Sequence, residues 1–203
     1  MIGGVILAAG FSSRMGQWKP LLPIGNTTFI KRLILQMREV GVEDIVVVTG
    51  YRHEELESHL IDEDVKCVCN EHFFETQMLD SVKLGISGLA KKYDRIMLSP
   101  VDVVMSPKWI FEKVINTEAD FVRPVYFGEP GHPVILNRSL YDYVLKYTGG
   151  RGLRGAVESS GMKITDLEVN EPSILLDADT PEDYEKVIRL YDENRPDQEW
   201  HFR

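Results

Sequence analysis

Two basic side chains and several small residues gather in one short segment near the amino terminus. Residues 5–23 read VILAAGFSSRMGQWKPLLP, in which an apolar run breaks at Gly10 into a loop that contains Arg14, Gly16 and Lys19. Glycine permits backbone angles that turn successive N–H groups towards an anion, and Arg and Lys supply charge suited to a polyphosphate. We therefore predict a buried strand followed by a loop that binds a nucleoside triphosphate.

Two common phosphate-binding motifs are absent from this segment. The P-loop pattern GxxxxGK[ST] places Lys directly after Gly, whereas Lys19 follows Gly16 by three positions and precedes Pro20. The dinucleotide-binding pattern GxGxxG is also missing. These absences argue against a P-loop ATPase and against a dinucleotide-dependent dehydrogenase.

Three aspartates are candidates for holding a metal ion near the phosphates. Asp102 follows the apolar run 95–99, which predicts a strand, and ligands of open α/β sheets bind at that end of the strands. Asp177 and Asp179 are two positions apart, so in an extended backbone only one of them would face the site. A hard divalent cation, here Mg²⁺, suits one or two carboxylates together with phosphates and water.

The opening segment resembles the signature LAAGxSxRMGxxKxLLP of the MobA/MocA-like nucleotidyltransferases, the molybdenum cofactor guanylyl- and cytidylyltransferase group. The matching residues are Leu7, Ala8, Ala9, Gly10, Ser12, Arg14, Met15, Gly16, Lys19, Leu21, Leu22 and Pro23. The resemblance implies a Rossmann-like fold of the nucleotide-diphospho-sugar transferase type. It also implies transfer of a nucleoside monophosphate to a small phosphorylated acceptor such as molybdopterin, with release of pyrophosphate.

The resemblance further assigns roles to individual residues. Arg14, Lys19 and Asp102 are the expected catalytic residues, and Asp102 with Asp179 the expected metal ligands, while Asp177 stays open as an alternative. The segment GHPV places Gly131, His132 and Pro133 beside the acceptor. The nucleotide is expected to contact Leu7, Ala8, Ala9, Gly10, Ser12, Ser13, Arg14, Gly16, Lys19 and Ser81.

The identity of both substrates follows from the resemblance alone. Ala9 in LAAG favours CTP, since guanylyl relatives carry LAGG, although GTP stays open. A sugar- or polyol-phosphate nucleotidyltransferase is an alternative within the same class. From other classes, a nucleotide-binding regulator or cofactor chaperone without turnover, and a scaffold that binds partners through Trp200 and Phe202, are also considered.

Composition limits the other partners. The chain has 203 residues and a net charge of -9, which argues against a nucleic-acid surface because such surfaces cluster Lys and Arg. No run of 18 apolar residues and no signal peptide is visible, so neither a membrane span nor export is expected, and the location is expected to be cytoplasmic.

Cys67 and Cys69 are interpreted as reduced core residues. The oligomeric state is not predicted.

The elements that must position these residues alternate along the chain. This alternation predicts one domain over 1–203 with a single doubly wound, mostly parallel α/β sheet and a polar tail over about 192–203. Ser106 is expected to cap the helix that Pro107 opens, and Thr180 the last helix. Strands are predicted at 44–49, 65–69, 95–99, 121–126, around 134 and at 164–169, and helices at 29–40, 54–60, 79–89, 107–116, 140–146, 153–159 and 181–192.

Overall fold

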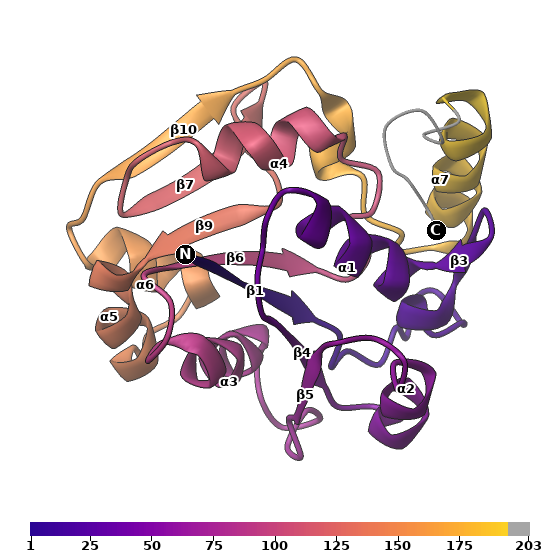
Figure 1. The fold of residues 1–203 in the computed structure, drawn as a ribbon, viewed down its shortest axis with the longest axis horizontal. Coiled ribbons are helices and arrows are strands. Elements are labelled where there is room, and N and C mark those ends of the chain that lie inside the picture. Colours follow the sequence, from indigo (N-terminus) through magenta and orange to yellow (C-terminus); the bar gives the residue numbers. More distant parts are fainter. Residues whose placement is uncertain (195–203) are drawn as a thin grey trace.

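A central, mostly parallel sheet organises the fold, which a computed structural model describes for residues 1–194. The strand order is β10-β7-β9-β6-β1-β4-β5, and Figure 1 shows it from β10 at the upper left to β5 at the bottom. The short β8 extends β7, and β2 and β3 form a separate hairpin. The strands are β1 (Ile2–Leu7), β2 (Pro23–Ile24), β3 (Thr27–Thr28), β4 (Ile45–Thr49), β5 (Lys66–Cys69), β6 (Arg95–Pro100), β7 (Phe121–Tyr126), β8 (Glu129–Pro130), β9 (Val134–Asn137) and β10 (Ile164–Glu168).

The direction of the strands confirms the predicted fold class. β1 runs parallel to both β4 and β6, β4 parallel to β5, and β7 parallel to β10. Only β9 among the longer strands is reversed, pairing antiparallel with β6 and β7. The reversal follows from the short β7–β9 connection, because parallel neighbours need a longer crossover.

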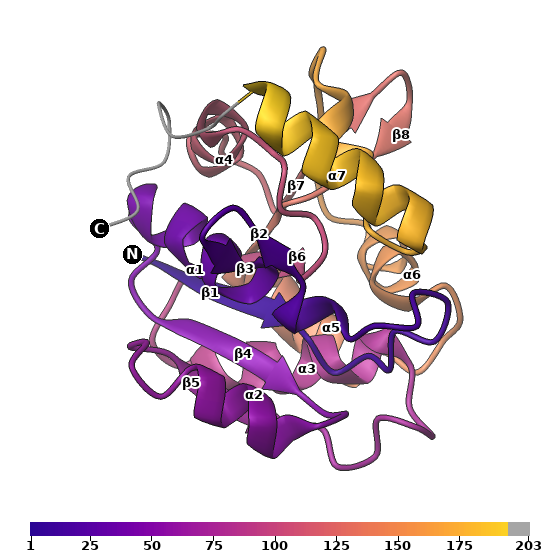
Figure 2. The ribbon, with the colours of Figure 1, turned by 90° about the vertical axis from the view of Figure 1, so that its right-hand side faces the viewer.

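Helices cover both faces of this sheet. Alternate residues of the strands point to opposite faces, so Ile6 and Val47 join one core while Val5 and Val46 join the other. α1, α2, α4 and α7 pack on the first core, and α3, α5 and α6 on the second; Figure 2 shows α1 and α4 opposite α5 and α6. The helices are α1 (Phe29–Glu39), α2 (His53–His59), α3 (Met78–Leu89), α4 (Lys108–Ile115), α5 (Tyr141–Lys146), α6 (Gly152–Ser159) and α7 (Pro181–Asn194).

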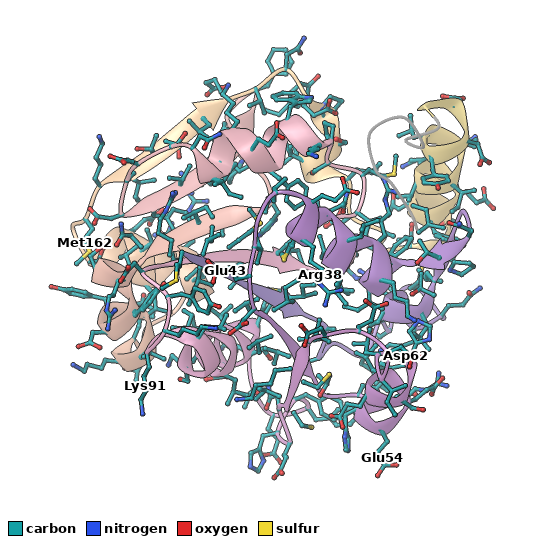
Figure 3. The ribbon with its side chains drawn as sticks, viewed as in Figure 1. Arg38, Glu43, Glu54, Asp62, Lys91 and Met162 are labelled. Atoms are coloured by element: carbon teal, nitrogen blue, oxygen red, sulfur yellow. The ribbon has the colours of Figure 1, made fainter. Side chains whose placement is uncertain are left out.

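The segment after α2 is tied to α1 by polar contacts. Arg38 of α1 lies 3.2 Å from Glu63 and donates to the Asp64 carbonyl oxygen at 2.8 Å. Figure 3 labels Arg38 on α1 and the neighbouring Asp62 after α2. These contacts hold α2 beside α1 on the same face of the sheet.

Two predicted helix boundaries need correction. Ser106 does not cap α4, because that helix begins at Lys108 and the buried Ser106 hydroxyl instead donates to the His132 carbonyl oxygen at 3.3 Å. α7 continues to Asn194, so residues 192–194 belong to the helix rather than to a tail. Thr180 does cap it, since its hydroxyl accepts from the Asp183 N–H at 3.2 Å.

Three further expectations concern cysteines, the membrane and the last residues. Cys67 and Cys69 are free, half-buried thiols, and burial raises the pKa of Cys67 to about 11. Among residues 1–194 no helix combines the length and the apolar character that a membrane span requires. The proposed scaffold residues Trp200 and Phe202 lie outside the described part of the chain.

Candidate active site

A cavity of about 520 Å³ opens where β1 and β6 end. The arrows of both strands point to the right in Figure 1, so Figure 2 views the molecule from the carboxyl ends of these strands. This is the edge at which α/β sheets bind ligands. The cavity is lined by predicted residues from five separate segments, namely Leu7, Ala8, Ala9, Gly10, Ser12, Ser13, Arg14, Lys19, Ser81, Asp102, His132 and Asp179.

The loop after β1 lines the cavity, and buried side chains in its second half fix it to the core. Met15 and Trp18 are 3% and 7% exposed, so they anchor the loop in the first core. Ser12 adopts a positive φ of 54°, and its hydroxyl accepts from the Lys19 N–H at 3.2 Å. Gly16, also at positive φ, lies on the outer side of the loop and does not line the cavity. Its predicted contact with the nucleotide stays a prediction, and its positive φ suits the turn.

Lys19 forms ion pairs with both predicted metal ligands. Its Nζ lies 2.6 Å from Oδ2 of Asp102 and 2.5 Å from Oδ1 of Asp179. The side chains of Lys19 and Asp102 are only 12% and 13% exposed, so solvent screens this pair little. Burial on its own would lower the pKa of Lys19, but the charges and hydrogen bonds of the two carboxylates together raise it. Lys19 is therefore a fixed cation between two carboxylates.

Asp177 and Asp179 make different contacts in the structure. Asp179 also pairs with Arg14, whose Nη2 lies 2.6 Å from Oδ2, so it contacts both predicted phosphate-binding cations. Asp177 lines the cavity without an ion pair to either cation. Burial, followed by the nearby Asp102 charge, raises the pKa of Asp177. Asp179 is thus the one that joins Asp102 at a shared cation.

The cavity is also lined by polar residues that were not among the predicted site residues. Asn70 directly follows β5 and is 4% exposed, and its Nδ2 donates to the Ser81 and Thr76 hydroxyls at 3.1 Å and 3.0 Å. Asn70, Thr76 and Gln77 all line the cavity. The position of Asn70 directly after a predicted strand was a signal that could have identified it.

Of the three predicted acceptor residues, only His132 lines the main cavity. Gly131 lies in a second cavity of about 160 Å³, and Pro133 lines neither. Gly131 has a structural reason to be glycine, because a Cβ there would lie 2.5 Å from the Ile174 carbonyl oxygen. Burial lowers the pKa of His132 to about 4, against the effect of the Asp102 charge, so its ring is neutral at pH 7. The predicted acceptor contacts of Gly131, His132 and Pro133 all stay predictions.

The geometry matches a site that binds a polyphosphate beside paired carboxylates, and known proteins share both sequence and fold with this chain. The MobA-like NTP transferase domain matches residues 4–164. The "Molybdenum cofactor cytidylyltransferase" of Escherichia coli (strain K12) is 28% identical over 190 residues, which cover 93% of this chain and 96% of that protein. The "Probable molybdenum cofactor guanylyltransferase" of Bacillus cytotoxicus is 30% identical over 131 residues, which cover 63% of each chain.

Solved structures agree with this assignment at the level of fold. The crystal structure of Rv0371c from Mycobacterium tuberculosis H37Rv superimposes with a TM-score of 0.81 at 23% identity, covering 93% of this chain and 97% of that one. A further crystal structure of that protein is a complex with manganese. The family match extends over most of the chain and includes the loop after β1 and Asp102. This chain therefore belongs to the MobA-like NTP transferase domain family of nucleotidyltransferases.

Proposed function

We propose that residues 1–203 form one enzyme domain that transfers CMP from CTP to a small phosphorylated acceptor such as molybdopterin, with Mg²⁺ as the metal. The observation that carries the proposal is the contact of one ammonium group, Lys19, with both Asp102 and Asp179, which all line the cavity. A solvated surface lysine would not be held in this way by two carboxylates from distant segments. The arrangement is that of a site built for a cation and a polyanion together.

The two carboxylates fit a divalent metal ion that takes its ligands partly from the protein and partly from a nucleotide. Asp102 and Asp179 approach one point closely enough to share a cation. No group of three His, Cys, Asp or Glu residues suited to a metal occurs within residues 1–194. A Mg²⁺ ion commonly takes one or two carboxylates and completes its shell with phosphate oxygens and water. When bound, the ion would neutralise charge on the phosphate oxygens.

The reaction needs little from the protein beyond positioning and charge. An oxygen of the acceptor phosphate forms a bond to the α-phosphorus of the nucleotide, and the bond between that phosphorus and the bridging oxygen breaks to release pyrophosphate. Negative charge on the phosphate oxygens is stabilised by fixed cations. Arg14 is suited to bidentate contact with the leaving pyrophosphate, and Lys19 acts as a point charge. No general base is assigned, because a phosphate oxygen is already ionised.

Two lines of support favour CTP and molybdopterin over other substrate pairs. Ala9 lies in the cavity wall within the LAAG sequence that resembles cytidylyltransferases. The relative from Escherichia coli that matches most of this chain is named a molybdenum cofactor cytidylyltransferase. The guanylyltransferase from Bacillus cytotoxicus keeps GTP as the second candidate, within the same mechanism.

The proposal is tested by pyrophosphate release. The assay takes the purified chain with MgCl₂, each of the four nucleoside triphosphates separately, and molybdopterin beside a panel of sugar and polyol phosphates. We expect release with CTP and molybdopterin. Release with another pair would refute the proposed substrates but retain the transferase chemistry, whereas nucleotide binding without any release would favour a regulator that does not catalyse transfer.

A matched pair of variants tests the role of Asp102. Asp102→Asn keeps the size of the side chain but removes the charge, and we expect it to lower kcat at least about 100-fold while the protein stays folded. Asp94→Asn is the control. Asp102 follows the carboxyl end of β6, whereas Asp94 directly precedes its amino end and forms an exposed ion pair with Arg138. Full activity of Asp102→Asn would contradict the metal assignment.

A further inference from the structure

A buried arginine and a buried glutamine lie directly behind the segment that carries Asp102. Arg32 and Gln36 occupy neighbouring turns on one face of α1 and are 1% and 0% exposed. Arg32 Nε donates to the Val104 carbonyl oxygen at 2.8 Å. Gln36 Nε2 donates to the carbonyl oxygens of Val104 and Ser106 at 3.2 Å and 3.1 Å. Three hydrogen bonds from α1 thus fix the backbone just after Asp102.

Arg32 also contacts the helix that follows Asp179. Its guanidinium carbon lies 5.1 Å from the centre of the Tyr191 ring on α7, within the range of a cation–π contact. Tyr184 of α7 also packs against Phe29 of α1, with ring centres 5.9 Å apart, and its hydroxyl donates to the Pro23 carbonyl oxygen of β2 at 2.7 Å. One side chain therefore touches the two structural units from which Asp102 and Asp179 extend.

Burying a charged arginine is costly, and packing alone does not require it. An apolar side chain such as methionine would avoid this desolvation cost. The guanidinium offers directed donors that an apolar side chain lacks, and these hold carbonyl groups in a set geometry. The segment 101–104 is otherwise held by the buried Val101 and Val104, by the Val101 N–H that donates to the Leu7 carbonyl oxygen at 3.1 Å, and by the Asp102–Lys19 ion pair. None of these contacts reaches the Val104 carbonyl oxygen, which Arg32 and Gln36 bond.

We infer that Arg32, assisted by Gln36, is a positioning residue that sets the distance between the Asp102 and Asp179 carboxylates for the nucleotide-bound metal. The inference rests on the proposed metal role of these two aspartates. Residues that orient metal ligands from outside typically change metal affinity or activity 10–100-fold when they are replaced. Arg32 itself contacts neither substrate nor metal in this assignment.

The test compares Arg32→Met with Arg95→Met. Arg95 is a suitable control because it also donates to two backbone carbonyls, of Ile115 and Thr117 at 2.6 Å and 2.8 Å, but from the far end of β6. Mn²⁺ affinity in the presence of CTP is measured by electron paramagnetic resonance, CTP affinity without metal by calorimetry, and kcat by pyrophosphate release. We expect Arg32→Met to weaken Mn²⁺ binding and lower kcat about 10–100-fold, with CTP affinity changed less than about twofold.

A purely structural role would give a different result. If Arg32→Met and Arg95→Met lose similar thermal stability, and Arg32→Met keeps Mn²⁺ affinity and kcat within twofold of the unaltered protein, the inference is overturned. Should Arg32→Met fail to fold, Gln36→Met removes two of the three hydrogen bonds without burying or exposing a charge. Gln36→Met is expected to weaken Mn²⁺ binding and to lower kcat, as Arg32→Met does. Unchanged Mn²⁺ affinity and kcat would overturn the inference.

A further measurement separates this inference from the proposed function. Amide hydrogen exchange over residues 101–107 reports the order of the Asp102 segment whether or not the protein is active. If the unaltered protein releases no pyrophosphate with any nucleotide, the proposed function fails. Faster exchange of this segment in Arg32→Met than in Arg95→Met would then still support the positioning role, and equal exchange would overturn it.

Discussion

Replacing Lys19 with methionine tests whether the ammonium group compensates two close carboxylates. Methionine has a similar length and no charge, so Lys19→Met leaves Asp102 and Asp179 facing one another without their shared cation. Both carboxylate oxygens lie within 2.6 Å of Lys19 Nζ, so they are no further apart than about 5 Å. The variant should therefore show the repulsion that Lys19 suppresses.

The size of the effect follows from Coulomb's law. Two unit charges about 5 Å apart repel by roughly 3 kcal/mol at an effective dielectric constant of about 20. Asp179 is 30% exposed, so solvent screens part of this repulsion, and removing Lys19 also removes the cost of burying its charge. We expect a net loss of about 2 kcal/mol in the free energy of unfolding.

Urea unfolding with and without excess MgCl₂ measures this effect. The control is Lys92→Met, because the Lys92–Asp44 pair has a similar distance of 2.7 Å but side chains that are 57% and 50% exposed. Exposed pairs contribute about 0–1 kcal/mol, so the control should change little. MgCl₂ should restore stability to Lys19→Met more than to the unaltered protein, because a divalent cation replaces the ammonium. Equal losses in both variants, with no differential effect of MgCl₂, would refute the reasoning.

Two other predictions concern packing and pH. Gly85→Ala should destabilise the protein by about 1–3 kcal/mol in urea unfolding, because its Cβ would lie 2.4 Å from Val5 Cγ1. Gly88→Ala, with its nearest contact at 3.3 Å, is the matched control, and equal stability of the two variants would show that α3 can shift. Because burial raises the pKa of Cys67 to about 11, the thiol stays protonated at pH 8 and becomes reactive only as the pH approaches that value. In a Cys69→Ser background its reaction with a disulfide reagent at pH 8 should be on the order of 100-fold slower than that of free cysteine, and a rate equal to free cysteine would contradict the raised pKa.

Much of the fold was predictable because local patterns and packing agreed. The helix predicted at 29–40 is α1, and the strand predicted at 95–99 is part of β6, since each carries apolar residues at the spacing of its buried face. The helix boundary at Ser106 was wrong for a physical reason. Serine favours a cap when its hydroxyl is free to bond its own helix, but that of Ser106 bonds the His132 carbonyl instead.

The acceptor residues show what a motif leaves undecided, because only His132 of the three lines the main cavity and the acceptor roles stay predictions. The GHP segment does border the site, but Gly131 is required by its close approach to Ile174 rather than by the main cavity. Asn70 and Thr76 line that cavity although no motif drew attention to them. A single sequence does not indicate which short loops from separate strands meet at one edge.

The sequence by itself determined the order of the main strands and helices, the glycine-containing basic loop after the first strand and the candidate aspartates. These features depend on local spacing and side-chain chemistry. Only the tertiary structure decided that Asp179, and not Asp177, shares Lys19 with Asp102, and that Arg32 contacts both the segment after Asp102 and the helix after Asp179. Lys19 and Asp179 are 160 residues apart in the chain, and contacts over such separations are set by how the helices pack on the sheet rather than by any local pattern.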